Sequence, residues 1–109
     1  MTDNEILARW QGWSQVIGIP DHQQARWSTG RGKMRILPDY LNNDAAAMSL
    51  LDTLVEKGYA VDMASRGHKW DIGIARNDCN LDYCISMTES TRREAVVAAC
   101  LELIVKEDV

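Results

Sequence analysis

The sequence predicts an α+β fold, in which helices pack on a small antiparallel sheet. Apolar residues alternate with small or polar ones on three consecutive runs between about residues 59 and 87, which is typical of a three-stranded meander. Turn-forming residues separate these runs. Stretches with the apolar periodicity of helices lie on both sides of the meander, at about 44–57 and 92–106, and a further helix is predicted at about 3–11.

The first predicted helix begins with a capping box. Thr2 is followed three residues later by Glu5, so each side chain can accept a hydrogen bond from the other residue's backbone amide. Gly12 is expected to end this helix. Residues 14–24 show no clear periodicity and are interpreted as a short extended piece followed by a surface loop.

Residues 26–37 have the pattern of a small hairpin with a glycine-rich turn. One aromatic and three basic side chains of this hairpin could bind a phosphate or a nucleobase, namely Trp27, Arg31, Lys33 and Arg35. The G-x-x-x-x-G-K-[ST] spacing of a phosphate-binding loop is absent. The alternative interpretation is a glycine turn with solvated basic strands.

The second predicted helix has clear signals at both ends. Asn43 or Asp44 suits the N-cap position, and Gly58 follows the helix where positive φ is common. The apolar residues between these ends form one stripe, made of Ala47, Leu50, Leu51, Leu54 and Val55. This stripe is expected to pack on the sheet.

The meander is predicted to have one face of large apolar residues and one face of small and acidic residues. Pairing of Ser65 with His68 would place Asp62 directly opposite Asp71. Two carboxylates in that position repel each other. A register shifted by two residues is therefore kept as the alternative.

The second hairpin of the meander is predicted to turn at residues 77–80, which are rich in Asn and Asp. Pairing of Arg76 with Leu81 would then place Ile72 opposite Ile85. Both hairpins would share one apolar face.

The small face of the meander carries Asp62, Asp71 and Asp82. In one interpretation it is the solvated side of a one-sided sheet. In the other it contacts a basic protein or a divalent cation, because neighbouring carboxylates repel unless they are protonated or bridged. The first interpretation is preferred for the sheet, and the three aspartates are the candidate protein-binding residues.

The last predicted helix is expected to be the central one. Thr91 and Glu94 repeat the capping-box spacing at its start. Apolar residues occupy almost every side of the helix, which is typical of a helix that is buried on more than one side. We therefore predict that it contacts both the sheet and the helix at 44–57.

Length and composition predict a single cytoplasmic domain that covers residues 1–109. No run of 18 apolar residues could span a membrane, and the acidic N-terminus does not resemble a signal peptide. The three cysteines form no paired-ligand motif, so free thiols are predicted, and neither a metal nor a cofactor is expected.

Charge is unevenly distributed along the chain. The formal net charge is −4, yet residues 26–35 contain four basic residues and no acidic one, which leaves −8 for the remainder. A mostly acidic protein is not expected to bind nucleic acid in general. A basic protein surface would be a suitable partner.

Short motifs are spread over most of the chain. They are the early Trp10-Gln11-Gly12-Trp13, then Pro38-Asp39-Tyr40, Asp44-Ala45-Ala46-Ala47, a helix that ends at Gly58-Tyr59, a second strand that contains Trp70, and the run from Ala95 to Leu101. Together they resemble the phage ABA sandwich domain family. The resemblance implies a small bacteriophage or prophage protein and implies no functional residues, because the family has no established activity. The basic hairpin at 26–35 is not part of the family's pattern.

No nucleophile–base pair, ligand set or nucleotide-binding loop is evident, so an enzyme is not expected. The leading hypothesis is a phage accessory protein that binds a host protein, for example to inhibit a bacterial defence system such as CRISPR. The first alternative is a protein that binds or sequesters a nucleotide through the hairpin. The second is a structural module that forms a homodimer through exposed tryptophans.

Overall fold

The computed structural model describes residues 2–15, 26–29, 34–76 and 85–107. Within these residues the chain forms three helices and two antiparallel sheets of three strands each, which confirms the predicted α+β class. None of the described helices has the length and apolar character needed to cross a membrane.

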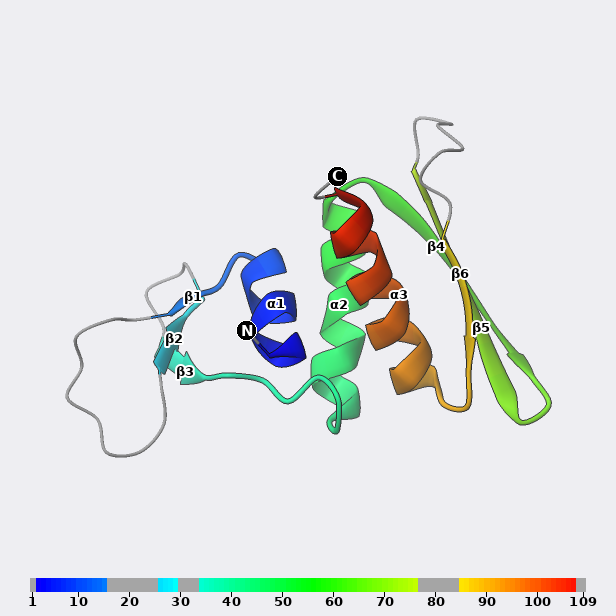
Figure 1. Cartoon of the computed structure of the whole chain (residues 1–109), viewed down its shortest axis with the longest axis horizontal. Coiled ribbons are helices and arrows are strands. Elements are labelled where there is room, and N and C mark those ends of the chain that lie inside the picture. The colour runs from blue at the N-terminus through cyan, green and yellow to red at the C-terminus, as the bar shows by residue number, and fades with distance from the viewer. Residues whose placement is uncertain (1, 16–25, 30–33, 77–84, 108–109) are drawn as a thin grey trace.

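The helices are α1 (Asp3–Trp10), α2 (Asp44–Glu56) and α3 (Arg92–Glu107), and every bound lies within one residue of its predicted position. The smaller sheet consists of β1 (Ser14–Gln15), β2 (Arg26–Ser28) and β3 (Met34–Ile36). The larger sheet consists of β4 (Tyr59–Arg66), β5 (Lys69–Arg76) and β6 (Ile85–Glu89). Figure 1 shows the helices between the two sheets, with α1 nearest the smaller sheet.

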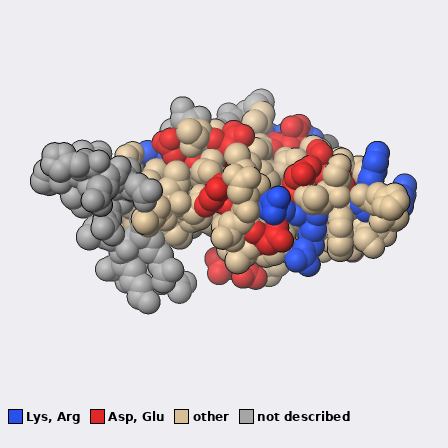
Figure 2. Space-filling model, turned by 90° about the horizontal axis from the view of Figure 1, so that it is seen from below, with Lys and Arg blue, Asp and Glu red and all other residues tan. Residues whose placement is uncertain are grey.

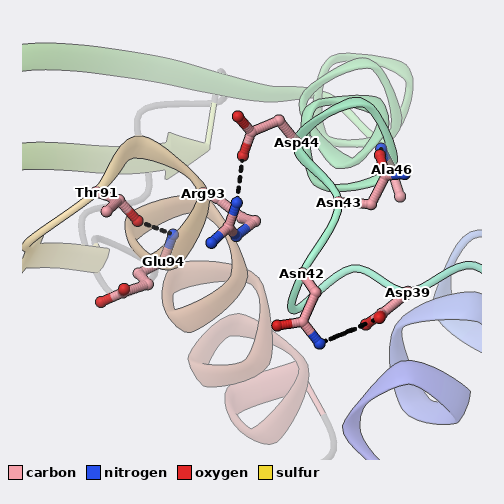
Figure 3. Close-up of polar contacts among 8 residues, drawn as sticks. All are labelled: Asp39, Asn42, Asn43, Asp44, Ala46, Thr91, Arg93 and Glu94. Atoms are coloured by element: carbon pink, nitrogen blue, oxygen red, sulfur yellow. Dashed lines mark hydrogen bonds and ion pairs between the residues drawn. The ribbon is translucent and has the colours of Figure 1, made fainter.

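Side-chain hydrogen bonds fix the starts of the helices. The Thr2 hydroxyl accepts from the Glu5 amide at 3.2 Å, and the Glu5 carboxylate accepts from the Thr2 amide at 3.4 Å, so the predicted capping box is present. Asn43 accepts from the third residue of α2 at 3.0 Å, and Thr91 accepts from the third residue of α3 at 3.1 Å (Figure 3). These local bonds explain why the helix bounds follow from the sequence.

The turn between β4 and β5 differs from the predicted one. Arg66 pairs with Lys69, so the turn consists of Gly67 and His68. Gly67 has a φ of +65°, and the turns that suit two-residue hairpins need positive φ at their first position. The predicted pairing of Ser65 with His68 is wrong, because it would have required Arg66 to adopt positive φ, which non-glycine residues rarely do.

The register of the larger sheet is therefore shifted by two residues from the preferred prediction. Asp62 and Asp71 do not lie opposite each other. In the second hairpin Ile72 lies opposite Met87 rather than Ile85. Because side chains alternate with a period of two, each residue stays on its predicted face despite the shift.

One continuous core joins the larger sheet to the helices. Both α2 and α3 cover one face of this sheet, and α3 also contacts α1 and α2, which confirms its predicted central position. Arg93 Nη1 of α3 contacts Asp44 Oδ1 at the start of α2, at 2.8 Å (Figure 3). The buried side chains of this part include Leu50, Leu54, Tyr59, Ile72, Ile74, Ile85, Val96, Cys100 and Leu103.

A polar network holds the end of α1 against α2. The buried Tyr40 hydroxyl donates a hydrogen bond to Gln11 Oε1. Gln11 Nε2 lies 3.1 Å from Ser49 Oγ and 3.0 Å from Thr53 Oγ1, to which it donates. Buried polar groups need such partners. The same burial raises the pKa of the Tyr40 hydroxyl above its ordinary value.

Candidate protein-binding site

The predicted acidic face is the side of the larger sheet that points away from the helices. Asp62 is exposed there, and among the described residues its carboxylate makes no hydrogen bond or ion pair. Asp71 is partly buried, lies 3.3 Å from Arg66 Nε, and accepts a hydrogen bond from Thr88 Oγ1 at 2.8 Å. Asp82 lies outside the described residues.

The larger sheet does not carry the acidic excess of the chain. Its strands contain three acidic and three basic residues, whereas the three helices contain eight acidic and four basic residues. In Figure 2 acidic side chains gather over the middle of the molecule, and basic side chains are seen both among them and at the end opposite the smaller sheet. The expectation of an acidic sheet face is corrected, because Arg66 and Lys69 share the described part of that face.

The outer face of the larger sheet is open and mostly polar. A depression of about 460 Å³ contains Asp62, Asp71, Ser86 and Thr88 among its lining residues. Within the described residues no group of three or more His, Cys, Asp and Glu side chains could hold a metal ion. Protein interfaces depend mainly on a few well-buried apolar anchors, which this depression does not offer.

The structure places Trp27 of the basic hairpin in the core. Its side chain is only 1% exposed, and the Arg9 guanidinium lies 5.2 Å from the centre of the ring. The ring therefore has no free face for stacking on a base. Arg31 and Lys33 lie outside the described residues, and Arg35 is described only as a backbone partner of Trp27 in the smaller sheet.

An apolar groove lies between α1 and α3. Its volume is about 520 Å³. The charged side chains that line it are exposed, whereas its apolar side chains are half-buried, except for the exposed Val105. The lining residues are Asp3, Ile6, Arg9, Trp10, Leu101, Ile104, Val105 and Glu107.

Three contacts hold Trp10 and Glu107 in place at the groove. Trp10 Nε1 donates to Glu107 Oε2 at 3.3 Å. The Tyr59 hydroxyl donates to the other oxygen of the same carboxylate. The Lys57 ammonium lies 5.3 Å from the centre of the Trp10 ring. Residues from α1, α3 and β4 thus order this part of the groove before any ligand arrives.

The apolar lining of the groove is the main sign of a binding site. Val105 is 61% exposed at the groove, although most valine side chains of the chain that lie on α3 are buried. Binding sites are commonly concave and lined mainly by apolar side chains. The groove has this property, and the outer face of the larger sheet does not.

The sequence pattern did not predict this groove. Of the three large apolar side chains on α1, only Leu7 is buried, whereas Ile6 and Trp10 are half-buried and line the groove. One signal in the sequence could have indicated it. The last helix has apolar residues on almost every side, and packing against the sheet and the helix at 44–57 cannot cover all of them. Leu101 and Val105 are the side chains that remain for the groove.

The buried thiol in α3 is not suited to catalysis. Cys100 is completely buried, and this burial raises its pKa to about 12. The thiol is therefore protonated at neutral pH, whereas a nucleophilic cysteine needs the thiolate form.

Comparison of the chain with protein-family models, with curated protein sequences and with solved structures finds no match. The resemblance to phage ABA sandwich domains stays a prediction.

Proposed function

We propose that this chain is a non-enzymatic phage accessory protein that binds a host protein through the groove between α1 and α3. The observation that carries the proposal is an exposed apolar groove between two helices that belong to one packed core. The proposal assigns binding to the groove instead of to Asp62, Asp71 and Asp82. No observation on the hairpin at 26–37 favours the nucleotide-binding alternative.

The shape of the groove suits an amphipathic segment of the partner. Its apolar side chains come from two neighbouring helices, so they form a continuous surface for the apolar face of a helix or an extended segment. In such interfaces a few buried apolar anchors supply most of the binding energy. We infer that the partner contributes at least one large apolar side chain at Val105.

The charge of the helices suits a partner segment with basic residues. Two of the three charged side chains at the groove are acidic, Asp3 and Glu107, and Arg9 is engaged with the ring of Trp27. The helices as a whole carry twice as many acidic as basic residues. Complementary charge of this kind raises the association rate and disfavours acidic partners.

Occupation of a functional surface on the host protein would be sufficient to inhibit it. This mode of action needs no catalytic group, and it is consistent with the small size and acidic charge of the chain. We propose a protein of a bacterial defence system such as CRISPR as the partner class, on the basis of the small size, the acidic charge and the resemblance to phage ABA sandwich domains.

The proposal can be tested by affinity capture from a bacterial lysate with three tagged baits. These are the wild-type protein, Val105→Asp in the groove and Val55→Asp as the matched control. Val55 was predicted to belong to the packed stripe of α2, but it is exposed outside the groove, at 66% against 61% for Val105. The baits are compared by quantitative mass spectrometry, with circular dichroism to verify that each is folded.

We expect at least one host protein to be retained in near-equimolar amount by the wild type and by Val55→Asp, and to be lost with Val105→Asp. Its retention should fall as salt is increased, because the flanking contacts are charged. Equal retention by all three baits would exclude the groove as the binding site. If no bait retains a host protein, the proposed function is wrong.

A further inference from the structure

The free edge of β4 is a second surface to which another strand could bind. Among the strands that the structure describes, β4 pairs with β5 only, so one side of β4 lies at the edge of the larger sheet. The strand has eight residues in an unbroken register and contains no proline, glycine or lysine. Edge strands of this length usually carry such residues, because an unprotected edge pairs with other strands.

The direction of the backbone amides on β4 follows from its turn. In a two-residue turn the carbonyl of Arg66 accepts from the amide of Lys69, and the amide of Arg66 lies on the same side, so both backbone groups of Arg66 point towards β5. Ladder positions alternate in an antiparallel pair. The amide and carbonyl groups of Val61, Met63 and Ser65 therefore point to the free edge. They are the groups that a further strand would bind.

The charges on β4 select one register for a second copy of the same strand. Antiparallel pairing of β4 with itself keeps matching faces together only when the two-fold axis passes through a residue. An axis at Asp62 would place two carboxylates opposite each other. An axis at Ala64 places Asp62 opposite Arg66 of the second copy, and the same ion pair forms again by symmetry.

Side-chain exposure is compatible with this register. Asp62 and Ala64 are exposed, and the Arg66 side chain is 83% exposed. Ala64 is small enough to let the two strands approach on the axis. In the non-hydrogen-bonded positions of an antiparallel pair, where these three residues would lie, opposite side chains come closest.

We propose that two copies of this chain pair antiparallel through β4, with Ala64 on the two-fold axis. The larger sheets of the two copies then form one continuous sheet across the dimer. The ion pairs between Asp62 and Arg66 of the other copy set the register. This interface does not involve the groove between α1 and α3, so it is independent of the proposed function.

Disulfide trapping tests the register. In the dimer the two copies of Ala64→Cys lie opposite each other, whereas two copies of Ala60→Cys are separated by roughly 25 Å along the strands. Ala60 is the matched control, because it is an exposed alanine on the same face of the same strand. Under mild oxidation Ala64→Cys should give a covalent dimer on a non-reducing gel, and Ala60→Cys should behave like the wild type. Equal cross-linking of both variants, or of neither, would overturn the proposal.

Charge exchange tests the ion pairs, with sedimentation velocity as the measurement. Asp62→Arg and Arg66→Asp should each be monomeric at concentrations where the wild type is dimeric. An equimolar mixture should restore a dimer, because each Arg then lies opposite an Asp of the other variant. Circular dichroism verifies that both variants are folded. A wild type that is monomeric at every concentration, or a mixture that stays monomeric, would contradict the proposed dimer. Val105→Asp should leave the dimer unchanged even if it abolishes host-protein binding.

Discussion

The part of the chain from α2 to α3 and the part before it are held together by different kinds of contact. From α2 onward, apolar side chains of two helices and three strands meet in a shared interior. The earlier part has strands of only two or three residues. It is joined to the rest through a smaller number of buried side chains, namely Leu7, Ala8 and Tyr40, and through the Gln11 network.

This difference shows two ways of building one fold. The later part is stabilised by many apolar contacts, and each contact supplies a small share of the free energy of unfolding. The earlier part contributes fewer buried apolar side chains to this interior and depends in addition on the hydrogen bond between Tyr40 and Gln11. The effects of substitutions on the free energy of unfolding should therefore differ between the two parts in size, in additivity and in pH dependence.

The largest loss should come from the shared interior. Ile74→Ala removes a side chain that is 0% exposed between β5 and the helices. Substitutions of this kind lower the free energy of unfolding by about 2–5 kcal/mol, because a cavity remains. Urea unfolding followed by circular dichroism measures this loss. Val55→Ala, at an exposed position, should change the same free energy by less than about 0.5 kcal/mol. A small loss for Ile74→Ala would mean that the interior repacks freely.

A smaller loss should come from the polar network of the earlier part. Gln11→Ala leaves the buried Tyr40 hydroxyl without its acceptor, and an unpaired buried group costs about 1–3 kcal/mol. Tyr40→Phe removes the hydroxyl that needs the partner. The double variant should therefore lose less stability in urea unfolding than the sum of the two single losses. Strict additivity would show that the two side chains do not act together.

The two parts should also respond to alkaline pH in different ranges. Cys100 ionises near pH 9 when unfolded and near pH 12 when folded, so the folded state holds the proton more tightly over this interval. The free energy of unfolding should fall by at most about 1.4 kcal/mol per pH unit between these values, and this thiol should have no effect at lower pH. Tyr40 has the same sign, but its contribution starts only near pH 10.

Urea unfolding at a series of pH values separates the two groups. Cys100→Ala should flatten the pH dependence between pH 9 and 10, whereas Tyr40→Phe should leave that interval unchanged. The comparison uses the slope with pH rather than the absolute stability, because each substitution also changes packing. Equal slopes in the wild type and Cys100→Ala would show that the thiol is accessible to water.

The smallest effects should come from the helix caps. Asn43→Ala removes the N-cap of α2, a helix that packs in the shared interior. This substitution should lower the free energy of unfolding by about 1 kcal/mol. Thr2→Ala removes the cap of α1 and should lower it less, since fraying of this end disturbs few buried contacts. Hydrogen exchange should show faster exchange across the molecule for Asn43→Ala and only within α1 for Thr2→Ala. Equal effects of the two substitutions would remove the distinction between the parts.

The features that the sequence could predict are those that depend on local patterns. Capping residues and apolar periodicity lie within one helix, and all three helices were located from them. The register of β4 and β5 was wrong by two residues, because a shift of two leaves every side chain on its face. Turn chemistry does distinguish the two registers, because the predicted one places Arg66 instead of Gly67 at the turn position that needs positive φ.

The features that could not be predicted depend on residues far apart in the chain. The strand β1 has two residues and exists only through pairing with β2. Gln11 bonds to side chains that lie 29 to 42 positions later. The groove forms only because α1 and α3 are neighbours, and no pattern within either helix predicts that they are. Asp62 and Asp71 were located on the correct face, but the basic residues that share it became apparent only with the correct register.

The contact between α1 and α3 also affects how the chain folds during synthesis. Translation delivers α1 early, yet the helix against which it packs is made only after the whole larger sheet. The nascent chain therefore carries the apolar side of α1 uncovered through most of its elongation. Chaperones act on transiently exposed apolar surface of this kind. Ribosomes stalled before α3 should accordingly hold a nascent chain whose first helix is not yet docked.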